Sequence, residues 1–164
     1  MTSKAYIVPE TAITFKSTGG TVAFTPTSVA TLAGRQSAQH DFGAAARSPI
    51  YNWRGYVKFA TTPVVGETVD IYLKTSDGTH LDNDDGTGDI AVSAADKLKN
   101  LRYIGSIVVD EASTAPEFSA SGTTAIYDRY VHVVFWNATT DSLSATAADN
   151  GFILEPIPFQ GQAT

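Results

Sequence analysis

The chain of 164 residues has no cysteine, which excludes disulfide bonds and thiolate metal sites. This absence fits a reducing compartment or a particle that is assembled in the cytoplasm. No run of apolar residues approaches the roughly 20 that a membrane-spanning helix needs. Met1 is followed by Thr-Ser-Lys rather than by the apolar core of a signal peptide. We therefore expect a protein that is made in the cytoplasm and does not enter a membrane.

Positive charge is also scarce. The 11 Lys and Arg residues are outnumbered by 17 Asp and Glu residues, which gives a net charge of −6. Because nucleic-acid binding needs a clustered cationic face, nucleic acid is not an expected partner. Charged residues make up 17% of the chain, below the usual quarter, and small polar residues replace them. A surface poor in Lys and Glu suits protein contact, and extracellular β-proteins share this composition.

Groups that carry chemistry are few. From Leu98 to Phe159 the predicted loops hold Gly, Ala, Ser and Thr, without a nucleophile motif or a phosphate loop. The histidines fall in three separate segments, which disfavours a shared metal site. They are His40, His80 and His132. No spacing of carboxylates suggests the paired acids of a glycosidase. We therefore expect a protein that is not an enzyme and needs no cofactor.

Strand patterns recur along the chain, and each alternation of apolar and polar residues predicts one buried and one exposed side. The predicted strands are Ala12–Phe15 and Thr21–Thr25, joined as a hairpin by Gly19-Gly20, then Asn52–Ala60, Thr68–Lys74, Leu101–Val109, Thr123–Asn137 and Gly151–Leu154. One short helix is expected near 94–99. Strands at this spacing indicate an all-β fold, an antiparallel β-sandwich of jelly-roll type. We expect an N-terminal arm over 1–10, a single domain over 11–154 and a tail over 155–164.

One face of the predicted sheet carries polar and aromatic side chains. Arg54, Tyr56 and Lys58 point outward on one strand, and Tyr72 and Lys74 do so on a strand expected to lie beside it. Tyr and Arg are frequent in the hot spots of protein interfaces, and aromatic rings flanked by polar groups also stack on sugars. The pattern predicts a protein contact, with a glycan-binding face or an ordinary exposed sheet as alternatives.

Both ends of the chain read as extended arms. Tyr6, Ile7 and Val8 form a short apolar patch, and Ile157 and Phe159 lie among prolines that cannot continue a β-ladder. An extended arm can add to the sheet edge of a neighbour through main-chain hydrogen bonds. These five residues are therefore predicted partner contacts. The alternative is that both ends are frayed.

An acidic loop is the strongest candidate for a metal site. Asp82, Asp84, Asp85 and Asp89 offer the hard oxygen ligands that calcium prefers, with glycines between them. The spacing of an EF-hand fails, because glycine falls at position five instead of six and Ser93 occupies position twelve. A solvated hairpin tip is the favoured interpretation of this loop, and a calcium site is the alternative.

Three parts of the chain carry a resemblance to a known family. They are Ile71–Gly78 with Asp84–Asp89, Leu101–Ile107 and Val133–Asn137. Together they resemble small structural proteins encoded among the head genes of tailed bacteriophages, and the likeness covers roughly residues 50–158. It is a likeness of strand sequences rather than of an active site.

The resemblance implies a non-enzymatic virion protein, of the capsid decoration (cement) type. Such a protein is a β-sandwich or β-barrel, often a homotrimer, that stabilises the capsid by bridging subunits of the major capsid protein. It would be made in the cytoplasm of the bacterial host and would lie on the capsid surface. The first 50 residues lie outside the likeness. A tail or fibre component with a glycan-binding β-sandwich, suggested by Trp53, Trp136 and the tyrosines, is therefore the alternative.

Overall fold

The computed structural model describes residues 5–7, 10–45 and 47–161, with side chains described over 10–45 and 47–158. Almost all regular structure is strand. The elements are β1 (Ala5–Ile7), β2 (Ile13–Lys16), β3 (Val22–Ala23), β4 (Ala33–Gln36), β5 (His40–Asp41), β6 (Ile50–Val57), β7 (Thr68–Ser76), β8 (Ile90–Val92), the 3₁₀ helix η1 (Ala95–Leu98), β9 (Arg102–Val108), β10 (Phe118–Ala125), β11 (Tyr130–Asn137), β12 (Gly151–Pro156) and β13 (Phe159–Gly161). In these ranges no helix has the length and apolar character to cross a membrane.

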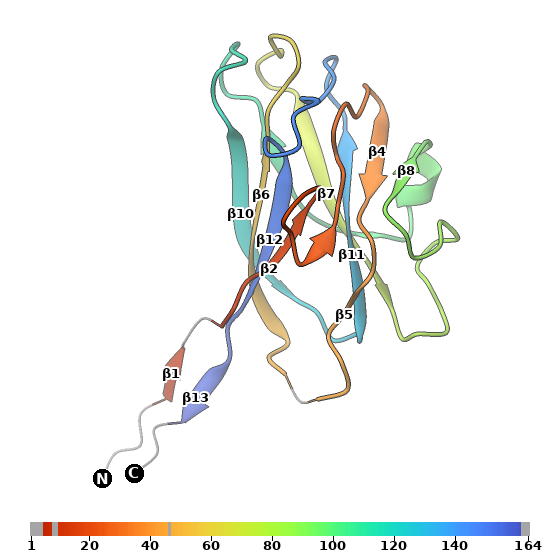
Figure 1. Cartoon of the computed structure of the whole chain (residues 1–164), viewed down its shortest axis with the longest axis vertical. Helices are drawn as coiled ribbons and strands as arrows, with labels where there is room; N and C mark the ends of the chain where they lie inside the picture. Colours follow the sequence, from red (N-terminus) through yellow and green to blue (C-terminus); the bar gives the residue numbers. More distant parts are fainter. Residues whose placement is uncertain (1–4, 8–9, 46, 162–164) are drawn as a thin grey trace.

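Two sheets form the body of the molecule (Figure 1). The first sheet has the strand order β10-β6-β12-β2-β3, and the second has the order β8-β4-β11-β7-β9, with β5 also paired to β11. The predicted all-β sandwich is confirmed. In both sheets strands from the two halves of the chain are neighbours: β2 pairs with β12, and β4 pairs with β11. This nested pairing is compatible with the jelly-roll type, which stays a prediction.

The main core lies between the inner faces of the two sheets. Phe135 from β11, Phe152 from β12 and Phe24 pack edge to face there, with ring centroids 5.0 to 6.3 Å apart. All three side chains are fully buried. The indole of Trp53 stacks on Phe152 at 6.0 Å. Such aromatic packing adds to the free energy gained from burial alone, so this core fixes how the two sheets sit on each other.

A second, smaller core covers the outer face of the second sheet. The segment 77–101, which contains β8 and η1 and is called the flap below, lies beside β4 and β11 in Figure 1. Leu98 and Leu101 of the flap pack against Val134 and Trp136 of β11, and all four side chains are buried. The outer face of β11 therefore packs against a layer of chain instead of facing water.

The flap explains why one residue predicted to be exposed is buried. Lys74 was expected to face solvent, but its side chain is fully buried. Its Nζ donates to Gln36 Oε1 at 3.0 Å and to the carbonyl oxygen of Gly86 at 2.7 Å. Alternation places Lys74 on the outer face as predicted, yet the flap covers that face. Burial lowers the pKa of Lys74 from its ordinary value, and nearby carboxylates oppose this shift.

Two strand predictions need correction. Residues 13–16 and 22–23 do not form an antiparallel hairpin, because β2 and β3 pair in parallel with Phe15 opposite Val22. The loop between them returns the chain to the start of the ladder, where Thr14 and Thr21 exchange hydrogen bonds. The single strand predicted over Thr123–Asn137 is two strands from different sheets, β10 and β11. The chain crosses from one sheet to the other between them.

The helix and the two ends also differ in detail from the predictions. The predicted helix is a single 3₁₀ turn, η1, and its first residue has no side-chain cap. β12 extends to Pro156, the last residue of its ladder, opposite Tyr51. Beyond the sandwich, β1 and β13 pair with each other as a two-stranded antiparallel unit, called the ribbon below. The ribbon projects from one end of the sandwich (Figure 1).

Candidate contact groove

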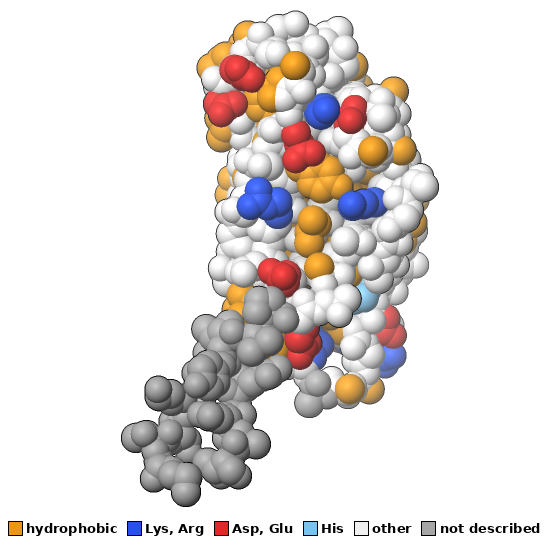
Figure 2. All heavy atoms as spheres, turned by 60° about the vertical axis from the view of Figure 1, so that its left-hand side comes forward, with side chains coloured by type: hydrophobic (Ala, Val, Ile, Leu, Met, Phe, Trp, Pro, Cys, Tyr) orange, Lys and Arg blue, Asp and Glu red, His pale blue; other side chains and the backbone are white. Residues whose placement is uncertain are grey.

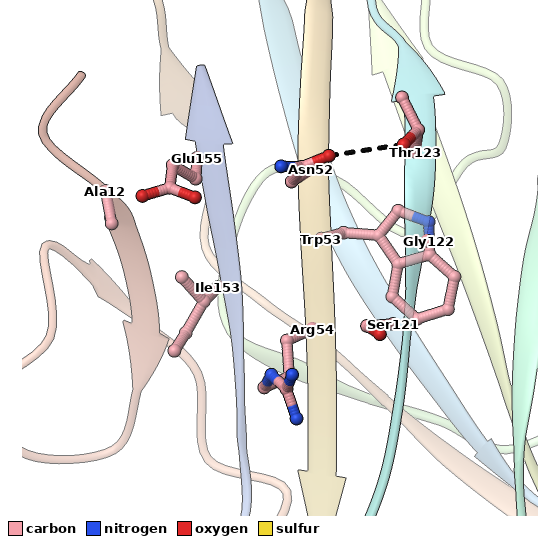
Figure 3. A pocket seen from close by; sticks show the side chains of 9 residues that line it. All are labelled: Ala12, Asn52, Trp53, Arg54, Ser121, Gly122, Thr123, Ile153 and Glu155. Carbon is pink, nitrogen blue, oxygen red and sulfur yellow. Dashed lines mark hydrogen bonds between the residues drawn. The ribbon is translucent and has the colours of Figure 1, made fainter. Parts of the chain in front are cut away.

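An open groove of about 600 Å³ lies on the outer face of the first sheet. Four strand regions contribute to it, from the residues just before β2 through β12 and β6 to β10 (Figure 3). The residues that line the groove are Ala12, Asn52, Trp53, Arg54, Ser121, Gly122, Thr123, Ile153 and Glu155.

Strand register explains why these residues meet. In one row across the sheet Arg54 lies opposite both Ile153 and Ser121, and in the next row Asn52 lies opposite Glu155 and Thr123. Because side chains alternate along a strand, both rows point to the outer face. The groove is therefore a product of pairing among β12, β6 and β10, which are distant in sequence.

The polar groups of the groove have few partners. Thr123 Oγ1 donates to Asn52 Oδ1 at 3.2 Å, and Arg54 makes one long contact to Ser119 Oγ at 3.5 Å. Within the described residues, neither Arg54 nor Glu155 forms an ion pair. The guanidinium and the carboxylate are thus available to an incoming partner. An Arg fork binds a carboxylate with two hydrogen bonds, which gives direction as well as affinity.

The floor of the groove is set by Trp53. Its indole points away from the groove between Gly122 on β10 and Gly105 on β9, where added Cβ atoms would lie 3.0 Å and 2.8 Å from the ring. Only glycine leaves room for the ring at these two positions. Trp53 is 5% exposed, so it offers an edge to the groove rather than a stacking platform.

The groove carries few reactive groups. Its hydroxyl groups, on Ser121 and Thr123, have no histidine or lysine beside them in the lining, and its one carboxylate, on Glu155, has no second acid. Nucleophilic catalysis needs a base within hydrogen-bond reach of the nucleophile, and glycoside hydrolysis needs two carboxyl groups. What the groove offers is a set of donors and acceptors around the aliphatic side chain of Ile153.

Of the outward residues predicted on β6, only Arg54 lines the groove. Tyr56 is buried, with 7% of its surface exposed, because its ring lies across Gly151 of β12. A Cβ atom on Gly151 would lie 2.5 Å from the Tyr56 hydroxyl. Lys58 comes directly after β6, and its Nζ lies 3.8 Å from Asp149 Oδ1. The expectation of an exposed Tyr56 is therefore wrong, and the neighbouring glycine is the reason.

Tyr72 lies on the other sheet. The prediction placed it on a strand next to β6, but β6 and β7 belong to different sheets. Tyr72 is half-buried against the flap core, and its ring packs edge to face on Tyr103 at 5.5 Å. Tyr103 is 55% exposed and its hydroxyl contacts Ser106 at 2.7 Å. The predicted stripe is therefore split between two surfaces.

The predicted contacts at the chain ends fall in or beside the ribbon. Tyr6 and Ile7 are in β1, opposite Gln160 and Phe159 of β13, while Val8 lies outside the described residues. Ile157 joins the ribbon to the sandwich through a 2.9 Å hydrogen bond from its N–H to the carbonyl oxygen of Ile50. The structure thus brings both predicted arms together.

The four aspartates of the acidic loop are distributed over three partners, Thr75, Lys97 and Arg35. Asp82 accepts from the backbone N–H and hydroxyl of Thr75 at 2.6 and 3.1 Å. Asp84 and Asp85 both pair with Lys97. Asp89 pairs with Arg35 at 2.6 Å. In the part of the chain that the structure describes, no three His, Cys, Asp or Glu side chains come together as a metal site. Lys97 and Arg35 thus pair with three of the four aspartates.

The three histidines lie apart. His132 is fully buried beneath the flap, where its Nδ1 donates to the carbonyl oxygen of Ser37 at 3.0 Å and its Nε2 has no partner. Burial lowers the pKa of His132 to about 4, and the Lys74 ammonium contributes to this shift. His40 packs on Phe42, and exposed His80 contacts Asp77. His132 lies within the apolar strand β11, where it is packed and hydrogen-bonded.

Sequence reasoning missed most of the groove, namely Asn52, Ser121, Thr123, Ile153 and Glu155. Asn52, Thr123 and Ile153 were placed on strands and Glu155 in the tail, but their role depends on which strands are neighbours. Ser121 lies in Phe118–Ala125, a run of small residues that was only partly read as a strand. Alternation of Phe118, Ala120 and Gly122 with Ser and Thr is the signal that identifies this strand.

Comparison with known proteins gives no relative on which to base an assignment. No protein-family model matches the chain, and a search of the curated proteins finds no match.

Proposed function

We propose that this chain is a non-enzymatic structural protein that works by docking, as a capsid decoration protein of a tailed bacteriophage. The observation that carries the proposal is the ribbon, in which both ends of the chain pair and project from one end of the sandwich (Figure 1). A two-stranded β-unit is marginally stable alone in water. The free edges of β1 and β13 offer main-chain donors and acceptors to a strand or surface of a neighbour.

The groove lies close to the base of the ribbon and extends the same contact region. Glu155 and Ala12, which line one end of the groove, are adjacent to the last bonds that hold the two chain ends together. There the N–H of Glu10 donates to the carbonyl oxygen of Pro156 at 3.1 Å. A neighbouring protein that pairs with the ribbon would meet Arg54 and Glu155 next, so edge pairing and side-chain recognition act together.

In this proposal the neighbour is the major capsid protein, and several copies of the chain, most simply three, would bridge its subunits on the capsid surface. The roles of the two regions differ. The sandwich supplies a rigid body with a large aromatic core, and the ribbon supplies the contact. The chain would bind without chemical change, which agrees with a groove that lacks a base beside its hydroxyl groups.

Binding to virions tests the proposal. Purified full-length chain and a variant without residues 1–8 and 159–164 are mixed with phage heads that lack the protein, and each mixture is sedimented. We expect the full chain to pellet with the heads and the truncated chain to stay in solution, while both unfold at a similar temperature. Asp96→Asn, an exposed change far from the ribbon, serves as a control that should pellet normally. Equal binding of the truncated chain would show that the ribbon is not needed for binding to the heads.

A glycan-binding tail or fibre component is the second candidate, and the groove is the observation that favours it. Its amide, hydroxyl and charged groups around Ile153 are of the kind that bind sugar hydroxyls. The tryptophans that suggested this function do not support it, because Trp53 and Trp136 are 5% and 6% exposed. A glycan array separates the two candidates: a specific sugar whose binding is lost in Arg54→Ala favours the second one.

A further inference from the structure

The end of the sandwich opposite the ribbon has a distinct surface. Four loops meet there, called the distal end below: residues 24–32, 58–67, 109–117 and 138–150 (Figure 1). Hydrogen bonds between the loops hold them together. Leu32 N–H donates to the carbonyl oxygen of Asn137 at 2.8 Å, and Gly66 N–H donates to that of Val109 at 2.8 Å. Glu67 accepts from the backbone and hydroxyl of Thr140 at 2.9 and 3.0 Å. The distal end is thus a defined surface.

Exposed aliphatic side chains gather at this end. Among the described residues, every large aliphatic side chain that is well exposed lies on these loops or at the strand end beside them. They are Leu32 at 66%, Val64 at 53%, Val65 at 55% and Val108 at 53%. The other exposed large hydrophobic side chains are tyrosines. Isolated exposed apolar residues are ordinary, but these four are restricted to one end of the molecule.

Leu32 is also strained. Its φ of +51° lies in the left-handed region, which a leucine enters at a cost of order 1 kcal/mol. Glycine or asparagine would fit this backbone better. The conformation therefore holds a large apolar side chain in water at some expense to stability. A contact made through this side chain would offset both costs.

The net charge of the chain is concentrated at the same end. The four loops carry six carboxylates and one lysine, a net charge of −5 against −6 for the whole chain. The lysine, Lys58, is already near Asp149. Asp110, Glu111 and Glu117 are exposed and have no side-chain hydrogen bond or ion pair within the described residues. Acidic and hydrophobic side chains both occur at the upper end of the molecule in Figure 2.

Exposed aliphatic side chains and negative charge both lie mainly at the distal end. We therefore infer that this end docks onto a second protein whose contact surface is aliphatic and rimmed by Lys and Arg. A second copy of this chain does not fit, because two surfaces of charge −5 repel each other. Phosphate-rich partners are disfavoured for the same reason. A cationic rim would neutralise Asp110, Glu111 and Glu117 while its apolar centre covers Leu32 and the valines. The inference does not depend on the role of the ribbon, which lies at the other end.

Designed peptides of known composition test the inference. The full chain, labelled with ¹⁵N, is titrated with an amphipathic helical peptide of Leu and Lys, with the same peptide carrying Glu for Lys, and with a Lys-only peptide. We expect the Leu/Lys peptide to shift the backbone amide signals of residues 64, 65 and 108, and the other two peptides to shift them little. Salt should weaken the binding, because exposed charges are screened.

Three variants, each changed only at exposed side chains, sharpen the test. In Val64→Ser/Val65→Ser/Val108→Ser the charges remain, and in Asp110→Asn/Glu111→Gln/Glu117→Gln the apolar side chains remain. Each should weaken binding of the Leu/Lys peptide about tenfold or more. Glu10→Gln/Asp96→Asn/Asp128→Asn makes the same change in net charge elsewhere and should change binding less than about twofold.

Each contrary outcome would overturn the inference. Amide shifts away from the distal end, equal binding of the Leu/Glu peptide, or an equal loss in the control variant would mean that no such surface exists. A concentration-dependent dimer that the three Val→Ser changes abolish would assign the surface to a second copy. Thermal unfolding of each variant, measured alongside, ensures that a loss of binding does not reflect a loss of fold.

Discussion

The outer faces of the two sheets differ in what lies over them. On the second sheet the flap buries Trp136, Val134 and even Lys74, and it encloses His132. On the first sheet the corresponding face is an open groove in which Arg54 and Glu155 have no ion partner among the described residues. Strands β6 and β7, one from each sheet, show similar alternation of apolar and polar residues. The comparison shows that alternation decides which side a residue takes, while the connections between strands decide whether that side meets water.

The largest expected effect concerns the covered face. Trp136→Ala should lower the free energy of unfolding by about 3–5 kcal/mol, because it removes a large ring from the flap core. Ile153→Ala, on the open face, should cost about 1 kcal/mol or less, because its side chain is only half-buried. Chemical denaturation of both variants measures the difference. Similar losses for the two would contradict the view that only one face is packed.

The next largest effect is expected from acid, which should lower the stability of the folded chain through His132 on the covered face. The pKa of His132 is lowered to about 4 in the folded chain, so between pH 6.5 and 4 the unfolded chain binds the extra proton. The stability that neutral His132 provides is complete above pH 6.5 and is lost as the pH falls toward 4. The loss should be about 3 kcal/mol at most.

The pH prediction is checked with His132→Gln. Denaturation midpoints of this variant and of the original chain are compared at several values between pH 7.5 and 4. The original chain should lose more stability over this range than the variant, which has nothing to protonate at this position. Parallel curves would show that His132 does not control the acid response and that the flap tolerates a second cation beside Lys74.

The fold was accessible to sequence reasoning where a pattern is local. Alternation located β6, β7, β9 and β12, and the absence of long helical patterns identified an all-β chain. Pairing partners were not accessible, because register depends on contacts between distant residues. The parallel pairing of β2 with β3 illustrates this, since Gly19-Gly20 is equally compatible with a hairpin. The burial of Lys74 depends on Gly86 and Gln36, which alternation within β7 cannot reveal.

A medium-sized effect is expected at Gly34, on the edge of the covered face. A Cβ atom there would lie 2.6 Å from the carbonyl oxygen of Phe135 and 3.1 Å from the Trp136 ring. Because the first contact is with backbone, Gly34→Ala should cost about 1–3 kcal/mol. Gly88→Ala, whose nearest neighbour is Ile90 at 3.5 Å, is the matched control and should change stability little. If both changes prove equally mild in thermal unfolding, the covered face is looser than its contacts indicate.

The smallest effect on stability is expected from Arg54→Ala on the open face. Its guanidinium is exposed and makes one long contact to Ser119, so the free energy of unfolding should change by less than about 0.5 kcal/mol. Binding to the proposed partner of the groove, the major capsid protein, should nevertheless weaken, because the groove loses its cation. A measurable loss of stability in a denaturant titration would mean that Arg54 serves the fold and not the contact.

The candidate site was only partly predictable for a related reason. Tyr6, Ile7, Ile157 and Phe159 were singled out by composition, but nothing in the sequence places β1 opposite β13. Arg54 was identified from alternation, whereas its neighbour Tyr56 was misplaced because Gly151, on another strand, makes room for its ring. Residues that act through partners across a sheet become visible only when the neighbouring strands are known.

The central claim is that the chain works by docking through the end that carries the ribbon. Cryo-electron microscopy of the parent phage tests it most directly. We expect density for the sandwich on the outside of the head, with β1 and β13 against the major capsid protein and the distal end pointing away from that contact. Heads without this density, or a sandwich attached with its ribbon free in solvent, would contradict the claim.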